Sequence, residues 1–173
     1  MKRSDINPMP QFFDRYINLV EDIDIFEAFE KYSPARIYDN ISKLTALKNK
    51  VYAPGKWTVK DILQHLIDNE RIMAYRALRF SRNDDTVLAG YEEELFAGNT
   101  LAAKRTVADL MEEFELVRKS TILLFRNMDN EMMLRSGVAY KSRISALALG
   151  FVVIGHAIHH MNVIRNRYYS LLD

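Results

Sequence analysis

The chain has 173 residues and a formal net charge of +1, is 49% hydrophobic and 27% charged, and contains no cysteine. This composition is typical of a globular protein, and the balanced charge argues against a basic surface for nucleic acid or acidic lipid. The lack of cysteine excludes disulfides, cysteine-ligated zinc and a cysteine nucleophile.

The length predicts a single domain over residues 1–173. The amino terminus, MKRSDINPMPQFFDRY, lacks the apolar core of a signal peptide. We expect no apolar run long enough to cross a bilayer, because Arg143 and the histidines bracket the most apolar stretch. The prediction is therefore a cytoplasmic protein without membrane or nucleic-acid partners.

Helical periodicity appears along almost the whole chain, and no stretch alternates cleanly enough to predict a sheet. Residues 1–23 form a short amphipathic lead-in. The first main helix is predicted near 24–48, with a kink or restart where Ser33 and Pro34 are typical of an N-cap and a first-turn proline.

The second helix is predicted over 58–82, because Thr58 and Asp61 have the spacing of a capping box. A loop follows over 83–105, which is long for a connection between helices of a bundle. Loops of this length are often lids over a site or crossovers.

The remaining two helices are predicted near 106–128 and 142–169, and Thr106 with Asp109 makes a second capping box. Four long helices in one domain predict an all-α fold, a four-helix bundle.

Three of the four histidines lie close together in the last predicted helix, within the motif GHAIHHM. His156 and His160 are four residues apart and so share one face of the helix, where both rings can bind one metal ion. His159 points about 60° away from that line, so we expect it to pack beside the site or support it. The plainer interpretation of this pair is two core histidines that are bonded to side chains or water.

The fourth histidine, His65, lies near the start of the second predicted helix, on the shoulder of its apolar stripe. Packing of the two helices could bring it to His156 and His160, since metal sites of bundles are built from facing helices. Spacing alone leaves the metal site and three unconnected core histidines as open alternatives.

Three histidines would hold one divalent transition metal, with zinc or nickel expected first, and would leave a position open. Such a metal acidifies a bound water and also favours the thiolate form of a bound thiol. Because the chain has no cysteine, a thiol would have to come from a small co-substrate.

Longer motifs make the chain recognisable. PGKWTVKDILQHLIDNERIMAYRALRFSR, LAGYEEELF and GHAIHHMNVIRNRY together resemble the DinB/YfiT-like superfamily of metal-binding four-helix bundles, over about residues 24–169. The resemblance implies that His65, His156 and His160 are the metal ligands, and that the protein is a homodimer. Relatives include S-transferases that use bacillithiol or mycothiol, a maleylpyruvate isomerase, and proteins assigned only as metal-dependent hydrolases.

One segment departs from the family pattern. Relatives commonly have Pro-Gly-Phe/Tyr-Asp in the central loop, where this chain has Ala89-Gly90-Tyr91-Glu92. We expect the difference to affect the shape of the loop and the choice of substrate.

Glu70 projects into the apolar stripe of the second predicted helix, where a carboxylate needs a partner. The favoured interpretation is structural: an ion pair with an arginine or lysine of another helix, or a bond to a tyrosine. The alternative, a catalytic role as a proton acceptor near the metal, is weakened by its position about 140° around the helix from His65.

Three functional hypotheses follow. The first is an enzyme in which the metal activates water or a small thiol for attack on a small electrophilic substrate, as a hydrolase or a thiol S-transferase. The second is a non-catalytic bundle in which the metal holds helices together or binds a small molecule. The third is an interaction scaffold with vestigial histidines.

Overall fold

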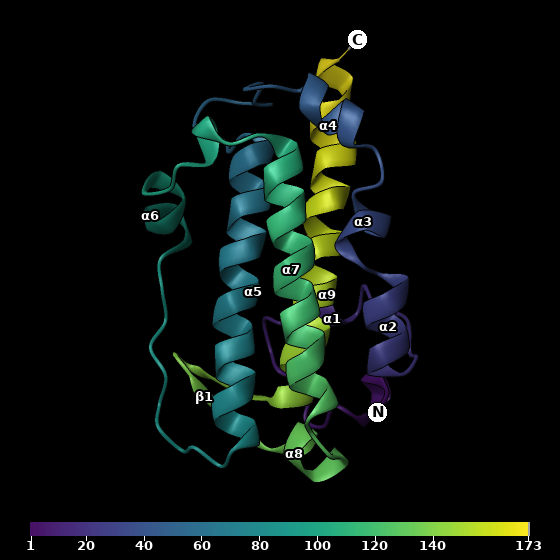
Figure 1. Ribbon diagram of the computed structural model, residues 1–173. Helices are drawn as coiled ribbons and strands as arrows, with labels where there is room; N and C mark the ends of the chain where they lie inside the picture. The colour runs from purple at the N-terminus through teal and green to yellow at the C-terminus, as the bar shows by residue number, and fades with distance from the viewer. Residues whose placement is uncertain (173) are drawn as a thin grey trace.

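The computed structural model describes residues 1–172 and has three long helices side by side (Figure 1). They are α5 (Val59–Ser81), α7 (Val107–Arg126) and α9 (Ala146–Val163). The fourth position of the bundle is filled by the short helices α2 (Ile25–Lys31), α3 (Pro34–Ile37) and α4 (Ile41–Ala46), which follow one another beside α9. The predicted four-helix bundle is thus confirmed.

The chain breaks twice within the region predicted as the first main helix, 24–48: the restart predicted at Ser33 and Pro34 is confirmed, whereas a second break was not predicted. Ser33 is extended, with φ −62° and ψ 153°, as the residue before a proline prefers, so α2 ends and α3 starts at Pro34. The second break falls at Asn40, whose side chain accepts a hydrogen bond from the backbone N–H of Lys43 at 2.9 Å and caps α4.

Both predicted capping boxes are present. Thr58 and Asp61 exchange side-chain and backbone hydrogen bonds at the start of α5, and Thr106 and Asp109 do the same at α7. The boundaries of these two helices lie within two residues of the predicted ones.

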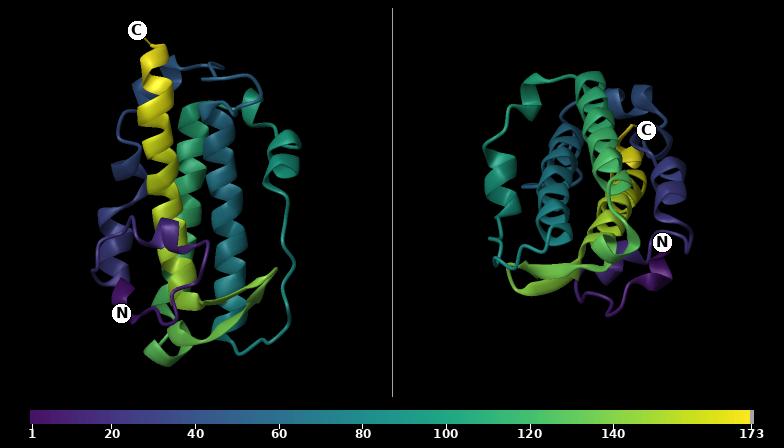
Figure 2. Two further views of the ribbon diagram at one scale, coloured as in Figure 1. Left: turned by 180° about the vertical axis from the view of Figure 1, so that it is seen from behind. Right: turned by 60° about the horizontal axis from the view of Figure 1, so that its bottom comes forward.

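The long segment after α5 is a crossover. It runs back along the whole bundle to the end where α5 started, so α5 and α7 are parallel to each other and antiparallel to α9 (Figures 1 and 2). The segment contains α6 (Glu93–Gly98) and a 3-10 turn (Ala102–Lys104). It therefore covers one side of α5 over much of its length.

A β-hairpin closes the lower end of the bundle and corrects two predictions, the absence of sheet and a last helix that starts at 142. After α8 (Asn130–Leu134), β1 (Ser136–Ala139) and β2 (Ser142–Ser145) pair antiparallel, with Gly137 opposite Ile144. α9 begins only at Ala146, where the Ser145 side chain caps it. Strands of four residues are too short for their alternation to stand out in a sequence.

α9 continues through a π-helical turn (Ile164–Tyr168) and a 3-10 turn (Tyr169–Leu171). By length and composition the stretch Ala146–Leu171 could cross a membrane, which corrects the expectation that no run is long enough. Most of the stretch is buried inside the bundle, as in the core helix of a globular protein.

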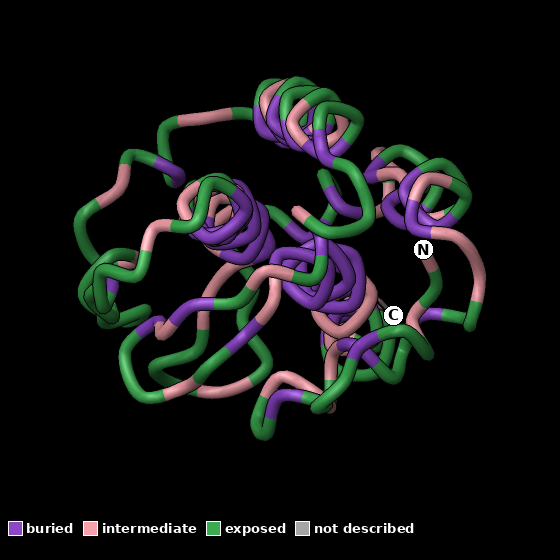
Figure 3. Tube along the Cα trace, turned by 90° about the horizontal axis from the view of Figure 1, so that it is seen from below, coloured by how far each residue is buried: buried purple, intermediate pink, exposed green. Residues whose placement is uncertain are grey.

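The apolar core is divided along the bundle into two clusters. Figure 3, which views the bundle from below, shows that the long helices turn their buried residues inward. The largest members of the clusters are Phe29, Phe80, Phe125 and Phe151 in one cluster and Tyr38, Phe114 and Tyr168 in the other. Buried polar side chains separate the two clusters, and we call them the polar layer: Asn69, Glu70, Arg118 and His156. The site described next adjoins this layer.

Candidate metal centre

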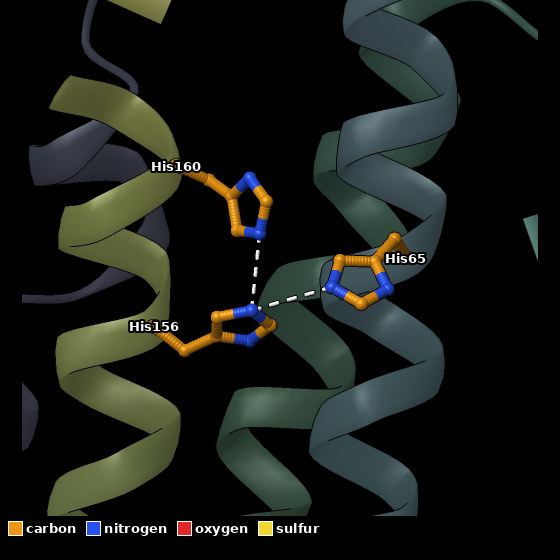
Figure 4. A group of neighbouring side chains, drawn as sticks. All are labelled: His65, His156 and His160. Carbon is orange, nitrogen blue, oxygen red and sulfur yellow. Dashed lines mark hydrogen bonds between the residues drawn. The ribbon is translucent and has the colours of Figure 1, made fainter. Parts of the chain in front are cut away.

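The structure brings the three predicted ligands together in the space between α5 and α9 (Figure 4). The Nε2 atom of His156 lies 3.2 Å from Nε2 of His65 and 3.0 Å from Nε2 of His160. These separations are close to the roughly 3 Å between neighbouring nitrogens around a metal with bonds of about 2.0–2.1 Å. The potential ligand atoms of all three residues lie within 4.8 Å of one another.

The helices explain this convergence. His156 and His160 are one turn apart on α9 and point in the same direction (Figure 4). His65 is only 5% exposed although it lies on the shoulder of the α5 stripe, because α5 packs against α7 on one side and α9 on the other. The edge of the α5 apolar stripe that carries His65 faces α9 and is therefore also buried.

All three rings are neutral at physiological pH, as metal ligands must be. Burial lowers the pKa of His65 to about 4 and that of His160 to about 3. The pKa of His156 is well below its ordinary value, first through burial and then through repulsion from His160 and His65. The nitrogen lone pairs are thus available to a cation.

Aromatic side chains wall the cluster on two sides. Trp57 lies against His65, with 4.8 Å between ring centroids, and stacks on His160 at 6.4 Å. On the other side the ring of Tyr16 meets His156 edge-on at 4.9 Å. These rings limit the access of water to the cluster.

Tyr16, whose ring packs against His156, belongs to the N-terminal lead-in. Its helix α1 (Asp14–Ile17) lies directly on α9, as the rear view in Figure 2 shows. A Cβ atom on Gly155 would lie 2.0 Å from the carbonyl oxygen of Tyr16. Only glycine allows this approach, so the residue before His156 determines how closely the lead-in covers the site.

One cavity borders the histidines, and a second, with no histidine in its wall, shares Glu94 with the first. The first, of about 220 Å³, has His160, Trp57 and Glu94 in its wall. The other, of about 610 Å³, lies where the crossover, the lead-in and the hairpin meet, and Tyr91 and Glu94 line it. Glu94 reaches both cavities and accepts a 3.0 Å hydrogen bond from the indole N–H of Trp57. A small molecule could thus lie beside the histidines.

Glu70 forms the buried ion pair expected from the sequence. Arg118 of α7 donates to its two carboxylate oxygens at 2.8 and 3.0 Å, and both side chains are almost completely buried. Arg118 also donates to the carbonyl oxygens of Tyr32 and Val153. Among the described residues Glu70 has no hydrogen bond to a histidine, so the geometry supports a structural role.

His159 lies beside the centre and not in it. Its half-buried ring packs edge-on against Tyr16 at 5.3 Å and against His160 at 5.2 Å, in keeping with the expected packing role. Sequence reasoning missed Asn69, whose side chain contacts His156. Its position four residues after His65 on the same helix was a usable signal.

The fold and the cluster define the class: a helical bundle with three neutral histidines converging between two of its helices. Residues 27–164 match the sequence profile of the DinB superfamily, and the chain belongs to that superfamily. It is also similar in structure to YfiT from Bacillus subtilis, described as a probable metal-dependent hydrolase with an unusual four-helix bundle topology. That likeness has a TM-score of 0.74 at 16% sequence identity, and covers 92% of this chain and 87% of the other. No curated protein matches the chain.

Proposed function

We propose that the protein is a metal-dependent enzyme in which His65, His156 and His160 bind one divalent metal, zinc or nickel in first place. The enzyme activates water or a small thiol for attack on a small electrophilic substrate. The observation that carries the proposal is the convergence of three neutral imidazoles beside a cavity. The similarity to YfiT, a probable metal-dependent hydrolase, supports the hydrolytic form.

The metal contributes Lewis acidity, which in a three-histidine zinc site lowers the pKa of a coordinated water from about 15.7 to about 7. The protein contributes the rest. The three histidines supply uncharged donors that preserve the charge of the metal. Trp57 and Tyr16 exclude bulk water and so strengthen electrostatic interactions within the site.

Hydrolysis and thiol transfer would share this centre and differ in what occupies the open position. The absence of cysteine from the sequence means that transfer needs a low-molecular-weight thiol as co-substrate. The alternative is a non-catalytic bundle in which the metal only joins α5 to α9. The candidate metal group has three members within residues 1–172, and three ligands favour an open, reactive position over a closed structural site.

Metal analysis of purified variants tests the site. His65→Ala, His156→Ala and His160→Ala are each expected to lose bound metal. The matched control is His159→Ala, which removes a neighbouring imidazole outside the group and is expected to retain metal. Undiminished metal content in the first three variants would contradict the proposal.

Activity assays separate the chemical alternatives. The metal-loaded protein is incubated with ester and amide substrates, and in parallel with small thiols and the electrophile monochlorobimane. Turnover of esters or amides without thiol indicates a hydrolase, and thiol-dependent conjugation indicates an S-transferase. Full metal content without turnover on either panel would favour the non-catalytic alternative.

The remaining expectations stay predictions: a cytoplasmic location, a homodimer, and no membrane or nucleic-acid partner. Sedimentation of the metal-loaded protein measures the oligomeric state directly, and a monomer at micromolar concentration would refute the homodimer.

A further inference from the structure

One of the three histidines is tied to a chain of hydrogen bonds that leads out to the crossover. Nδ1 of His156 lies 3.2 Å from the side-chain oxygen of Asn69, and the Asn69 amide nitrogen donates to the Tyr91 hydroxyl at 2.7 Å. Asn69 is buried on α5, one turn after His65. By contrast, Nδ1 of His160 is buried without a partner among the described residues.

The direction of the Asn69 amide determines where His156 carries its proton. An amide oxygen only accepts, so Nδ1 of His156 must be the protonated nitrogen, and its Nε2 keeps the lone pair that faces His65 and His160. If the amide were turned over, its nitrogen would donate to Nδ1. The proton of His156 would then lie on Nε2, the atom that a metal needs.

The crossover holds the outer end of this chain in place. The backbone carbonyl of Ala89 accepts a 2.9 Å hydrogen bond from Arg76 of α5, and the ring of Tyr91 packs on Phe96 at 4.9 Å. The Tyr91 hydroxyl is therefore fixed over Asn69. A neutral phenol can accept from an amide or donate to it, and the bond formed here, from the Asn69 N–H to the Tyr91 oxygen, is the one that leaves the amide oxygen facing His156.

We infer that Asn69 and Tyr91 are positioning residues, which fix His156 in the tautomer and orientation that leave its Nε2 free for a metal. The consequence for metal affinity rests on the proposed function, whereas the tautomer is a property of the metal-free protein. Partners of this kind typically change metal affinity by roughly 10- to 100-fold when they are removed.

Long-range proton–nitrogen NMR of the imidazoles tests the tautomer without any metal. Wild-type His156 is expected to carry its proton on Nδ1, and Tyr91→Phe, which leaves the amide free to turn over, is expected to show both tautomers. A wild-type proton on Nε2 would overturn the inference. An unchanged spectrum in Tyr91→Phe would remove Tyr91 from it.

Zn²⁺ titration against a chelating indicator tests the consequence. Asn69→Leu, which has a similar size but no acceptor, is expected to bind roughly 10- to 100-fold more weakly. Asn69→Asp keeps an acceptor and is expected to bind Zn²⁺ clearly more tightly than Asn69→Leu. Tyr75→Phe is the matched control for Tyr91→Phe, since Tyr75 lies exposed on α5 and, among residues 1–172, its hydroxyl bonds to Arg79 alone.

Circular dichroism of each variant shows that it is folded before it is titrated. Equal Zn²⁺ affinity of Asn69→Leu and wild type would overturn the positioning role. If wild type binds neither Zn²⁺ nor Ni²⁺, the proposed function fails, and the NMR result still decides the tautomer.

Discussion

Replacing Glu70 by glutamine tests whether this carboxylate is structural, because the change keeps the shape and removes the charge. In the protein both oxygens accept from Arg118, which is 1% exposed. Glutamine offers a single acceptor, and its NH₂ group would face the guanidinium donors. Arg118 would keep its bonds to the carbonyls of Tyr32 and Val153, but its charge would be buried without a counter-charge.

Breaking a buried pair by removing one partner costs about 3–5 kcal/mol. For a chain of this length a loss of 1 kcal/mol lowers the unfolding midpoint by about 2–4 °C, so we expect a shift of roughly 6–20 °C. Thermal unfolding followed by circular dichroism measures it. Metal content below the unfolding transition is expected to equal that of wild type.

The double variant Glu70→Leu with Arg118→Met is the control for this reasoning. It removes both charges and replaces them with apolar groups, so it is expected to be more stable than Glu70→Gln despite carrying more changes. A Glu70→Gln protein as stable as wild type that has lost turnover would refute the structural interpretation. It would make Glu70 catalytic.

Three further predictions concern the surroundings of the centre. Gly155→Ala should force α1 away from α9, because the new Cβ would overlap the Tyr16 carbonyl. We expect the free energy of unfolding, measured in urea, to fall by about 1–3 kcal/mol. Unchanged stability would show that the lead-in adapts freely. Burial lowers the His65 pKa from 6.5 to about 4, so below pH 6.5 the unfolded chain binds a proton that the folded chain excludes. The metal-free protein should therefore lose about 2 kcal/mol from this group between pH 7.5 and pH 5, and His65→Gln should reduce that loss. Finally, free Zn²⁺ at 100 times its dissociation constant should stabilise the protein by about 2.7 kcal/mol, and a chelator should reverse the shift in midpoint.

The parts of the fold that depend on neighbouring residues could be predicted from the sequence. The caps at Thr58 and Thr106 use partners three residues away, and the helices that they start were predicted within two residues. The pairing of His156 with His160 has the same local origin. The hairpin was missed, since four-residue strands carry too little periodicity, and the break at Asn40 was missed because it depends on a single side-chain cap.

Contacts between segments far apart in the sequence could not be predicted from local patterns. His65 meets His156 across 91 positions of sequence, and only the packing of α5 on α9 places them together. The family resemblance predicted that His65 lies beside His156. Helical projection alone placed His65 at the edge of the apolar stripe and did not predict the contact. Tyr91 reaches Asn69 because the crossover returns along α5, a path that no local pattern specifies. Glu70 shows the middle case: its need for a cation could be predicted, but the identity of Arg118 could not.

The location of the polar layer explains why the centre and the ion pair occur together. Buried polar groups are costly wherever they lie, and each of these has found a partner within the same layer: Glu70 with Arg118, and His156 with Asn69. Because both pairs join different helices, each also fixes the register of α5 against its neighbours, Arg118 on α7 and His156 on α9. If α5 slid by one turn, both pairs would break and His65 would separate from His156. The ion pair therefore supports the geometry of the centre without touching it, and loss of the pair should loosen metal binding only at temperatures where α7 begins to move.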